Sequence, residues 1–130
     1  MVKQKQEPWE PVSFISAEAG DDLIISFAVY QLDDPADVES LIILRIPNHE
    51  RFLYEWERGA AVSFDRDPVT DERVLLREVV YSPEDKSIVL RTDHRTYRLD
   101  LRKVDPKELS AMCPVFRKMN FDSSILLTGV

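Results

Sequence analysis

The sequence is poor in the residues that most catalytic and metal sites need. Among its 130 residues are one cysteine, Cys113, two histidines, His49 and His94, and three glycines. A lone cysteine forms no internal disulfide, which agrees with a reducing compartment. Without a His-x-x-x-His or Cys-x-x-Cys pair we expect no structural zinc site, and three glycines leave little backbone freedom for a phosphate-binding loop. We therefore expect no enzyme and no cofactor.

Long apolar runs are also missing. No segment approaches the ~20 consecutive apolar residues of a membrane-spanning helix. The polar start, MVKQKQEPWEP, lacks the apolar core of a signal peptide, so we expect a cytoplasmic protein that does not bind membranes. The 24 acidic against 17 basic residues give a formal charge of −7. This charge disfavours nucleic acid as a partner and suits a basic protein partner.

The residues that are present predict one folded domain. Hydrophobic residues make up 44% of the chain, which is enough for a continuous core. We expect residues 1–11 to form a flexible N-terminal arm, because they are polar and contain two prolines, and residues 12–130 to form a single domain. No internal repeat or second composition boundary divides that range.

Short apolar or alternating segments, separated by turn residues, predict about six to eight strands. They are VSFIS (12–16), LIISFAVYQ (23–31), SLIILRI (40–46), AAVSF (60–64), RVLLREVVY (73–81), SIVLRTD (87–93) and TYRLDLRK (96–103), with an apolar tail at 123–130 that joins this sheet or a neighbouring subunit. Because strands and helices do not alternate, we expect an α+β fold with an antiparallel, meander-like sheet, one central helix and one C-terminal helix.

The central helix is expected in NHERFLYEWERG (48–59). Asn48 can cap it, Phe52 and Trp56 are four residues apart, and Gly59 suits its end. The segment allows two interpretations. Either Phe52 and Trp56 point into the core while Tyr54 lies on the surface, or the aromatic and acidic side chains form a protein-binding surface. For the second case the candidate binding residues are Tyr54, Glu55, Trp56 and Glu57, with Leu126 of the apolar tail.

The C-terminal helix is expected to begin at DPKE. Asp105 would be its N-cap and Glu108 would complete a capping box. Leu109, Met112, Cys113, Phe116 and Met119 then fall on one stripe, which places Cys113 in the core. Pro114 would remove the hydrogen bond to the carbonyl of Ser110, so we expect a kink or break near Cys113.

Two alternatives assign Cys113 a chemical role. The Cys113-Pro114 pair resembles the haem-regulatory dipeptide, in which a thiolate ligates the iron, and His49 or His94 would be the second ligand. The protein would then bind or sense haem. In the other alternative, Cys113 pairs with a histidine as the nucleophile of a small enzyme.

The expected core follows from the inward positions of these elements. We predict that it contains Phe14, Leu23, Ile25, Phe27, Ile43, Val62, Leu90, Leu99, Leu101, Leu109, Met112, Cys113 and Phe116.

The order of these segments resembles a family of small immunity proteins from bacterial polymorphic toxin systems. The resemblance rests on the opening pair VSFISAEAGDDLIISFAVY, the strand LIILRI, the later segments REVVYSPEDKSIVLRTD and TYRLDLRK, and the helix DPKELSAMCPVFRKMNF. It spans roughly residues 12–121 and implies a cytoplasmic, non-catalytic antidote that binds a toxin domain. The leading prediction is therefore a non-catalytic protein-binding domain, either an antidote of this type or a homodimeric accessory protein.

Overall fold

The computed structural model describes residues 9–67 and 73–130, in which eight strands form one open sheet. The strands are β1 (Glu10–Ala19), β2 (Leu23–Tyr30), β3 (Val38–Arg45), β4 (Ala61–Phe64), β5 (Leu76–Ser82), β6 (Ser87–Thr92), β7 (Thr96–Asp100) and β8 (Leu126–Thr128). The helices are α1 (Pro47–Glu50) and α2 (Pro106–Met119), with a 3-10 turn, η1 (Glu55–Glu57). The expected α+β class is confirmed. β1 begins at Glu10, inside the segment predicted to be an arm.

The sheet is mixed, so the expectation of a simple meander is wrong. Its strand order is β4-β3-β2-β1-β7-β6-β5-β8. Two antiparallel units, β1 to β4 and β5 to β7, are joined by parallel pairing of β1 with β7, and β8 runs parallel to β5. Parallel neighbours require long connections. The chain supplies one through α2, which links β7 to β8.

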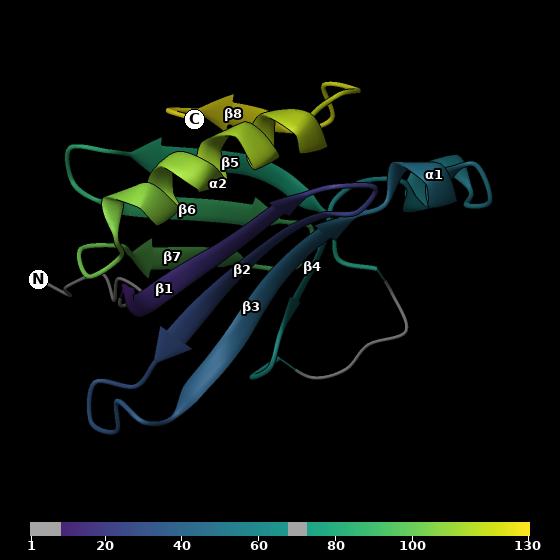
Figure 1. The fold of residues 1–130 in the computed structure, drawn as a ribbon. Coiled ribbons are helices and arrows are strands. Elements are labelled where there is room, and N and C mark those ends of the chain that lie inside the picture. Colours follow the sequence, from purple (N-terminus) through teal and green to yellow (C-terminus); the bar gives the residue numbers. More distant parts are fainter. Residues whose placement is uncertain (1–8, 68–72) are drawn as a thin grey trace, which may run out of the picture.

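The core lies between the two units of the sheet. β1 to β4 slant across β5 to β7, and α2 runs along one side of them (Figure 1). The helix buries one stripe of side chains in the same hydrophobic cluster as the inward residues of the strands: Leu109, Met112, Val115, Phe116 and Met119. The expected core is confirmed except at Phe14, which is 53% exposed, and at Cys113, which is only half-buried.

A β-bulge explains the error at Phe14. The register of β1 against β2 shifts between Val12 and Phe14. An extra residue in one strand reverses which following side chains point inward. Val12 and Ile15 are therefore buried, and Phe14 points outward.

The central helix is shorter than expected. Ile46, with no side-chain cap, precedes Pro47 at the first position of α1, so Asn48 lies inside the helix. The chain is extended at Tyr54 before η1 begins. Phe52 and Trp56 consequently do not share a buried helical face, and the interpretation that placed them in the core is wrong.

The C-terminal helix continues through Pro114 to Met119, so the expected break does not occur. Burial of Met112 and Val115 on either side of the proline offsets the cost of its missing hydrogen bond. Asp105 is the N-cap and accepts a bond from the Lys107 amide at 2.8 Å, as expected.

The prediction that Glu108 completes a capping box is wrong. Its carboxylate accepts a 2.8 Å hydrogen bond from the backbone N–H of Ile15 in β1. β1 pairs with β7 only at Glu10 and Pro11, so further along its backbone needs another partner on that side. Glu108 thus ties the first turn of α2 to the point where the two strands separate.

Candidate protein-binding site

The segment between α1 and β4, residues 51–58, carries three exposed aromatic side chains; we call it the aromatic loop. Phe52 is 71% exposed, Tyr54 66% and Trp56 72%. The rings of Tyr54 and Trp56 stack with centroids 4.5 Å apart and planes 4° from parallel. The guanidinium of Arg51 lies 4.8 Å from the Phe52 ring centroid. These aromatics pack on one another and on a cation, and they remain accessible to a partner.

A buried arginine holds the start of this loop in place. Arg45, the last residue of β3, donates from Nε and Nη2 to the carboxylate of Glu50 in α1, at 2.7 and 2.9 Å. Its Nη1 donates to the carbonyl of Met119 at 2.7 Å, and both Nη atoms donate to Asp122 at 3.0 and 2.7 Å. The Phe121 ring lies 4.1 Å from the guanidinium. The last residue of α2, the segment that follows α2 and the residue before the aromatic loop therefore all bind the side chain of Arg45.

The electrostatics of this cluster favour full ionisation. Burial alone would lower the pKa of Arg45, but its hydrogen bonds to Glu50 and Asp122 outweigh burial and raise it. The hydrogen bond from Arg45 holds the pKa of Asp122 well below its usual range. No buried side-chain nitrogen or oxygen within the described ranges lacks a hydrogen-bond partner. A buried network whose polar groups are all paired holds its residues in one arrangement, because moving any one of them away would leave a buried charge without a partner.

A groove of about 180 Å³ opens beside the aromatic loop. Its apolar walls come from Leu44 and Ala61 of the sheet and from Ile46, Phe52 and Leu53. His49 and Arg73 line it as well. In Figure 1 the α1 segment, from which the aromatic loop continues, projects from one end of the sheet.

The remaining predicted binding residues are divided between two places. Glu55 is exposed and Glu57 half-buried, both in η1 beside the aromatic rings. Leu126 is 63% exposed but lies on β8, at the other end of the strand order from β4. It does not line the groove. The tail joins its own sheet, with Ile125 buried and Leu127 packed against the core.

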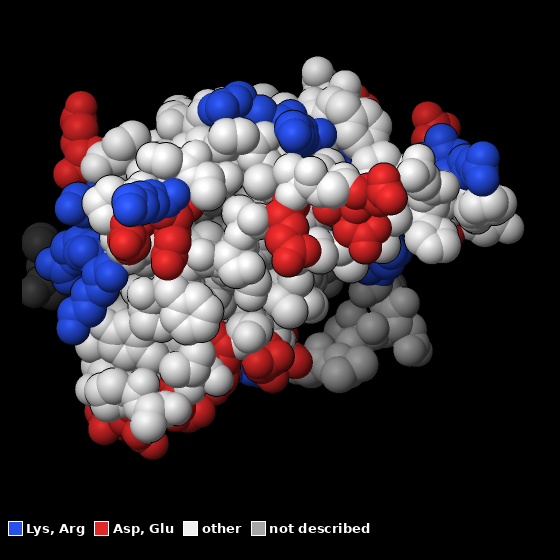
Figure 2. Space-filling model, viewed as in Figure 1, with Lys and Arg blue, Asp and Glu red and all other residues white. Residues whose placement is uncertain are grey.

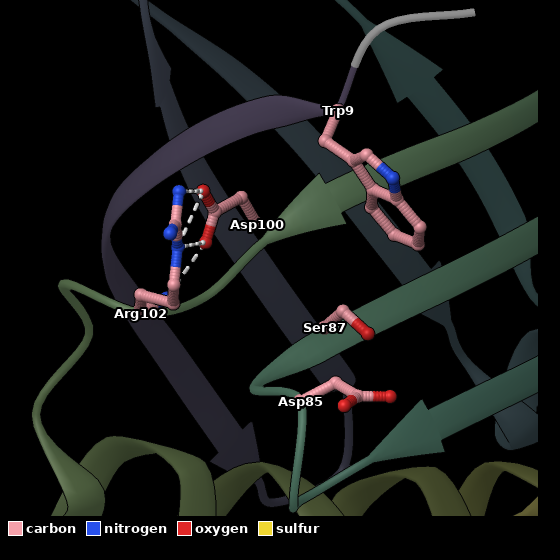
Figure 3. Close-up of a pocket in the computed structure, with 5 residues that line it drawn as sticks. All are labelled: Trp9, Asp85, Ser87, Asp100 and Arg102. Carbon is pink, nitrogen blue, oxygen red and sulfur yellow. Dashed lines mark hydrogen bonds and ion pairs between the residues drawn. The ribbon is translucent and has the colours of Figure 1, made fainter. Parts of the chain in front are cut away.

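A second hollow, of about 360 Å³, lies at the other end of the sheet (Figure 3). It is lined by Trp9, Asp85, Ser87, Asp100 and Arg102. Arg102 binds Asp100 with Nη2 2.7 Å from Oδ2, and this bond lowers the pKa of Asp100. The cation and this carboxylate therefore neutralise each other, while Asp85 has no cation among the residues that line the hollow other than Arg102. No periodic pattern or motif in the sequence predicts this hollow.

The three residues of the haem and enzyme alternatives lie on different elements. Cys113 is half-buried on α2, and burial raises the pKa of its thiol. His49, on α1, packs edge-on against Phe52 with centroids 6.3 Å apart. His94 is exposed in the β6–β7 turn, where its backbone N–H donates to Thr92 Oγ1 at 3.1 Å. In residues 9–67 and 73–130, no three His, Cys, Asp or Glu side chains form a group that could hold a metal ion.

Comparison of the chain with protein-family models, curated proteins and solved structures gave no match. Among the described residues, no helix has the length and apolar character needed to cross a membrane. The candidate site therefore rests on its own geometry.

Proposed function

We propose that this protein is a non-catalytic protein-binding domain whose aromatic loop is the main contact. The supporting observation is the exposure of Phe52, Tyr54 and Trp56 at 66–72% within five residues, on a loop anchored by the buried Arg45. Tyrosine and tryptophan dominate the energetics of protein interfaces because they bury large areas at small entropic cost. An anchored loop also loses little conformational entropy when a partner binds.

Two further features favour an antidote that binds a toxin. The order of strands and the terminal helix resembles that of immunity proteins of polymorphic toxin systems, and such a protein needs no catalytic group. The formal charge of −7 would speed association with a basic partner such as a nuclease toxin. The antidote role is the specific form of the proposal, and binding through the aromatic loop is its general form.

Quantitative affinity capture tests the general form. The wild-type protein and a Tyr54→Ser/Trp56→Ser variant are each immobilised at equal amounts and exposed to lysate of the source cells. Val80→Ser is the matched control, because Val80 is 37% exposed on β5, away from the aromatic loop and from β1 to β4. We expect a protein that wild type and control retain equally and the double variant loses by about tenfold or more. Equal retention by all three proteins contradicts the proposal.

A further inference from the structure

The outward face of β1 to β4, which we call the front face, is unusually apolar for a solvated surface. Cross-strand pairing puts Ile24 opposite Leu44, and the apolar side chains there are those of Phe14, Ile24, Ala28, Ile42, Leu44 and Ala61. The other outward positions are four serines, Glu18, and the paired Tyr30 and Val38. Ala28 and Tyr30 are buried on this face, and Phe14 and Val38 are exposed. These four strands contain one cationic residue, Arg45, and it is fully buried.

The corresponding outward face of β5 to β7 has the composition of a solvated surface. There Arg91 Nε lies 3.1 Å from Glu78 Oε1. Val89 of β6 is paired with Val80 of β5 on one side and with the exposed Arg98 of β7 on the other. The two faces belong to one sheet, so their difference is not explained by strand propensity. Contiguous apolar surface without charge marks an interaction site in folded proteins.

The front face continues into the groove beside the aromatic loop. Leu44 and Ala61 belong to both, since they are paired across β3 and β4 and also line the groove with Ile46, Phe52 and Leu53. No described element crosses the front of β2 and β3, as Figure 1 shows, and α2 packs on the inner side with the core. The apolar floor and the aromatic loop thus form one surface.

Acidic residues border this surface at both ends of β2. Asp21 and Asp22 are exposed in the β1–β2 turn, and Asp33, Asp34 and Asp37 are exposed in the β2–β3 connection. In Figure 2 the area over β2 and β3 is mostly uncharged, with acidic side chains below it and to its right and basic side chains at its left. Lys103 Nζ lies 5.9 Å from the ring centroid of Tyr30, at the end of β2. An apolar centre with an acidic border is complementary to an apolar patch bordered by lysine or arginine.

We propose that the front face and the aromatic loop together dock a basic protein through an apolar segment flanked by cationic side chains. This inference rests on the proposed function and adds the chemistry of the partner. A second copy of the chain fits less well, because a symmetric dimer through this face would bring two acidic borders together. Like charges at an interface oppose association.

Synthetic peptides of equal length test the partner chemistry. The first alternates lysine with leucine, the second lysine with serine, and the third glutamate with leucine. Trp9→Phe leaves Trp56 as the sole tryptophan reporter in residues 9–67 and 73–130. We expect saturable binding of the Lys–Leu peptide by Trp56 fluorescence, and binding about tenfold weaker for each of the other two peptides. Equal binding of the Lys–Ser peptide would show charge attraction alone and overturn the proposal.

Substitutions on the two faces locate the binding surface. Ile42→Lys puts a cation at the centre of the front face, while Val89→Lys makes the same change on the outward face of β6. We expect Ile42→Lys to weaken Lys–Leu binding by about tenfold and Val89→Lys to change it less than about twofold. Ile42→Thr keeps a β-branched strand former and replaces the lysine variant if that one fails to fold. Unchanged binding in the Ile42 variant would overturn the proposal.

Two further readouts separate this inference from the proposed function. Calorimetric titration measures Lys–Leu binding in these variants, because Trp56→Ser removes the fluorescent reporter. If Tyr54→Ser/Trp56→Ser retains peptide binding and Ile42→Lys loses it, the front face is the docking site and the aromatic loop is not. If the reverse holds, the loop binds and the front-face inference is wrong. Sedimentation of the unliganded protein is expected to give a monomer. A dimer that Ile42→Lys dissociates would replace the basic partner with a second copy.

Discussion

Arg45 and Glu50 form a bidentate ion pair in the interior, with Nε 2.7 Å from Oε2 and Nη2 2.9 Å from Oε1. The arginine ends β3, and the glutamate belongs to α1, directly before the aromatic loop. Through the same guanidinium, the carbonyl of Met119 and the carboxylate of Asp122 are fixed to the end of the sheet. This pair fixes the residue that directly precedes the aromatic loop to the end of the sheet.

Breaking that pair is expected to destabilise the fold. Arg45→Met leaves the carboxylate of Glu50 buried without a cation, and loss of one member of a buried pair costs about 3–5 kcal/mol. Urea unfolding should therefore show a fall of about 3 kcal/mol in the free energy of unfolding. Adding Glu50→Leu should recover part of this loss, because no uncompensated charge then remains. A loss below about 1 kcal/mol in Arg45→Met would mean that the network contributes little.

Stability should also depend on the ionisation of Asp122. Arg45 lowers the pKa of this carboxyl in the folded protein below its ordinary value of 3.8. In that range the unfolded chain binds more protons, so stability rises with pH. The contribution is complete above about pH 4 and is lost as the pH falls through the folded-state pKa.

Urea unfolding of Asp122→Asn measures this contribution. The difference in unfolding free energy between wild type and the variant should be largest near neutral pH and should shrink steadily below the ordinary pKa of 3.8. Asp33→Asn, on an exposed loop, is the control and should show no such trend. A difference that stays constant down to acid pH would contradict the assigned role of Asp122.

The attachment of β8 depends on a glycine. Gly129 has φ +84°, and a Cβ there would lie 1.9 Å from the carbonyl oxygen of Tyr81. Gly129→Ala should therefore displace the chain end and weaken the pairing of β8 with β5, at a cost of about 1–3 kcal/mol. Hydrogen exchange of the β5 and β8 amides would detect the loss. Gly20→Ala, where a Cβ meets nothing within 4 Å, should leave exchange unchanged.

Cys113 is expected to act as a packing residue. Burial raises the pKa of its thiol, which lowers the thiolate fraction at neutral pH and slows iodoacetamide labelling of the native protein. Cys113→Ser should cost about 1 kcal/mol of stability and leave partner binding unchanged. A haemin titration distinguishes the haem alternative. A saturable Soret band in wild type that Cys113→Ser loses would contradict the packing role and favour haem binding.

The sequence predicted the strands well because their apolar runs and alternation are local signals. TYRLDLRK alternates cleanly, and Tyr97, Leu99 and Leu101 are all buried. The bulge in β1 has no such signal, so Phe14 was expected on the wrong face. The pairing of β1 with β7 depends on residues about 89 apart in the chain, such as Glu10 and Leu99, and periodicity cannot report it.

The candidate site was predicted in part for similar reasons. The alternation of aromatic and acidic residues identified Tyr54 and Trp56, but the four-residue spacing of Phe52 and Trp56 also suggested a buried helical face. Arg45 at the end of an apolar strand looks like a solvated residue, because its partner Asp122 lies 77 positions away. The exposure of the front face was not predicted, because a nearly continuous apolar run is typical of a strand that is buried on both faces.

The most direct test of the central claim is calorimetric titration of the captured partner, once purified, into wild type and Tyr54→Ser/Trp56→Ser, with urea unfolding of both proteins. Because the two rings are exposed, the unfolding free energies should agree within about 0.5 kcal/mol. The dissociation constant should rise about 30-fold or more, as expected when interface aromatics are removed. Equal affinities at equal stability would contradict the claim that the aromatic loop is the binding surface.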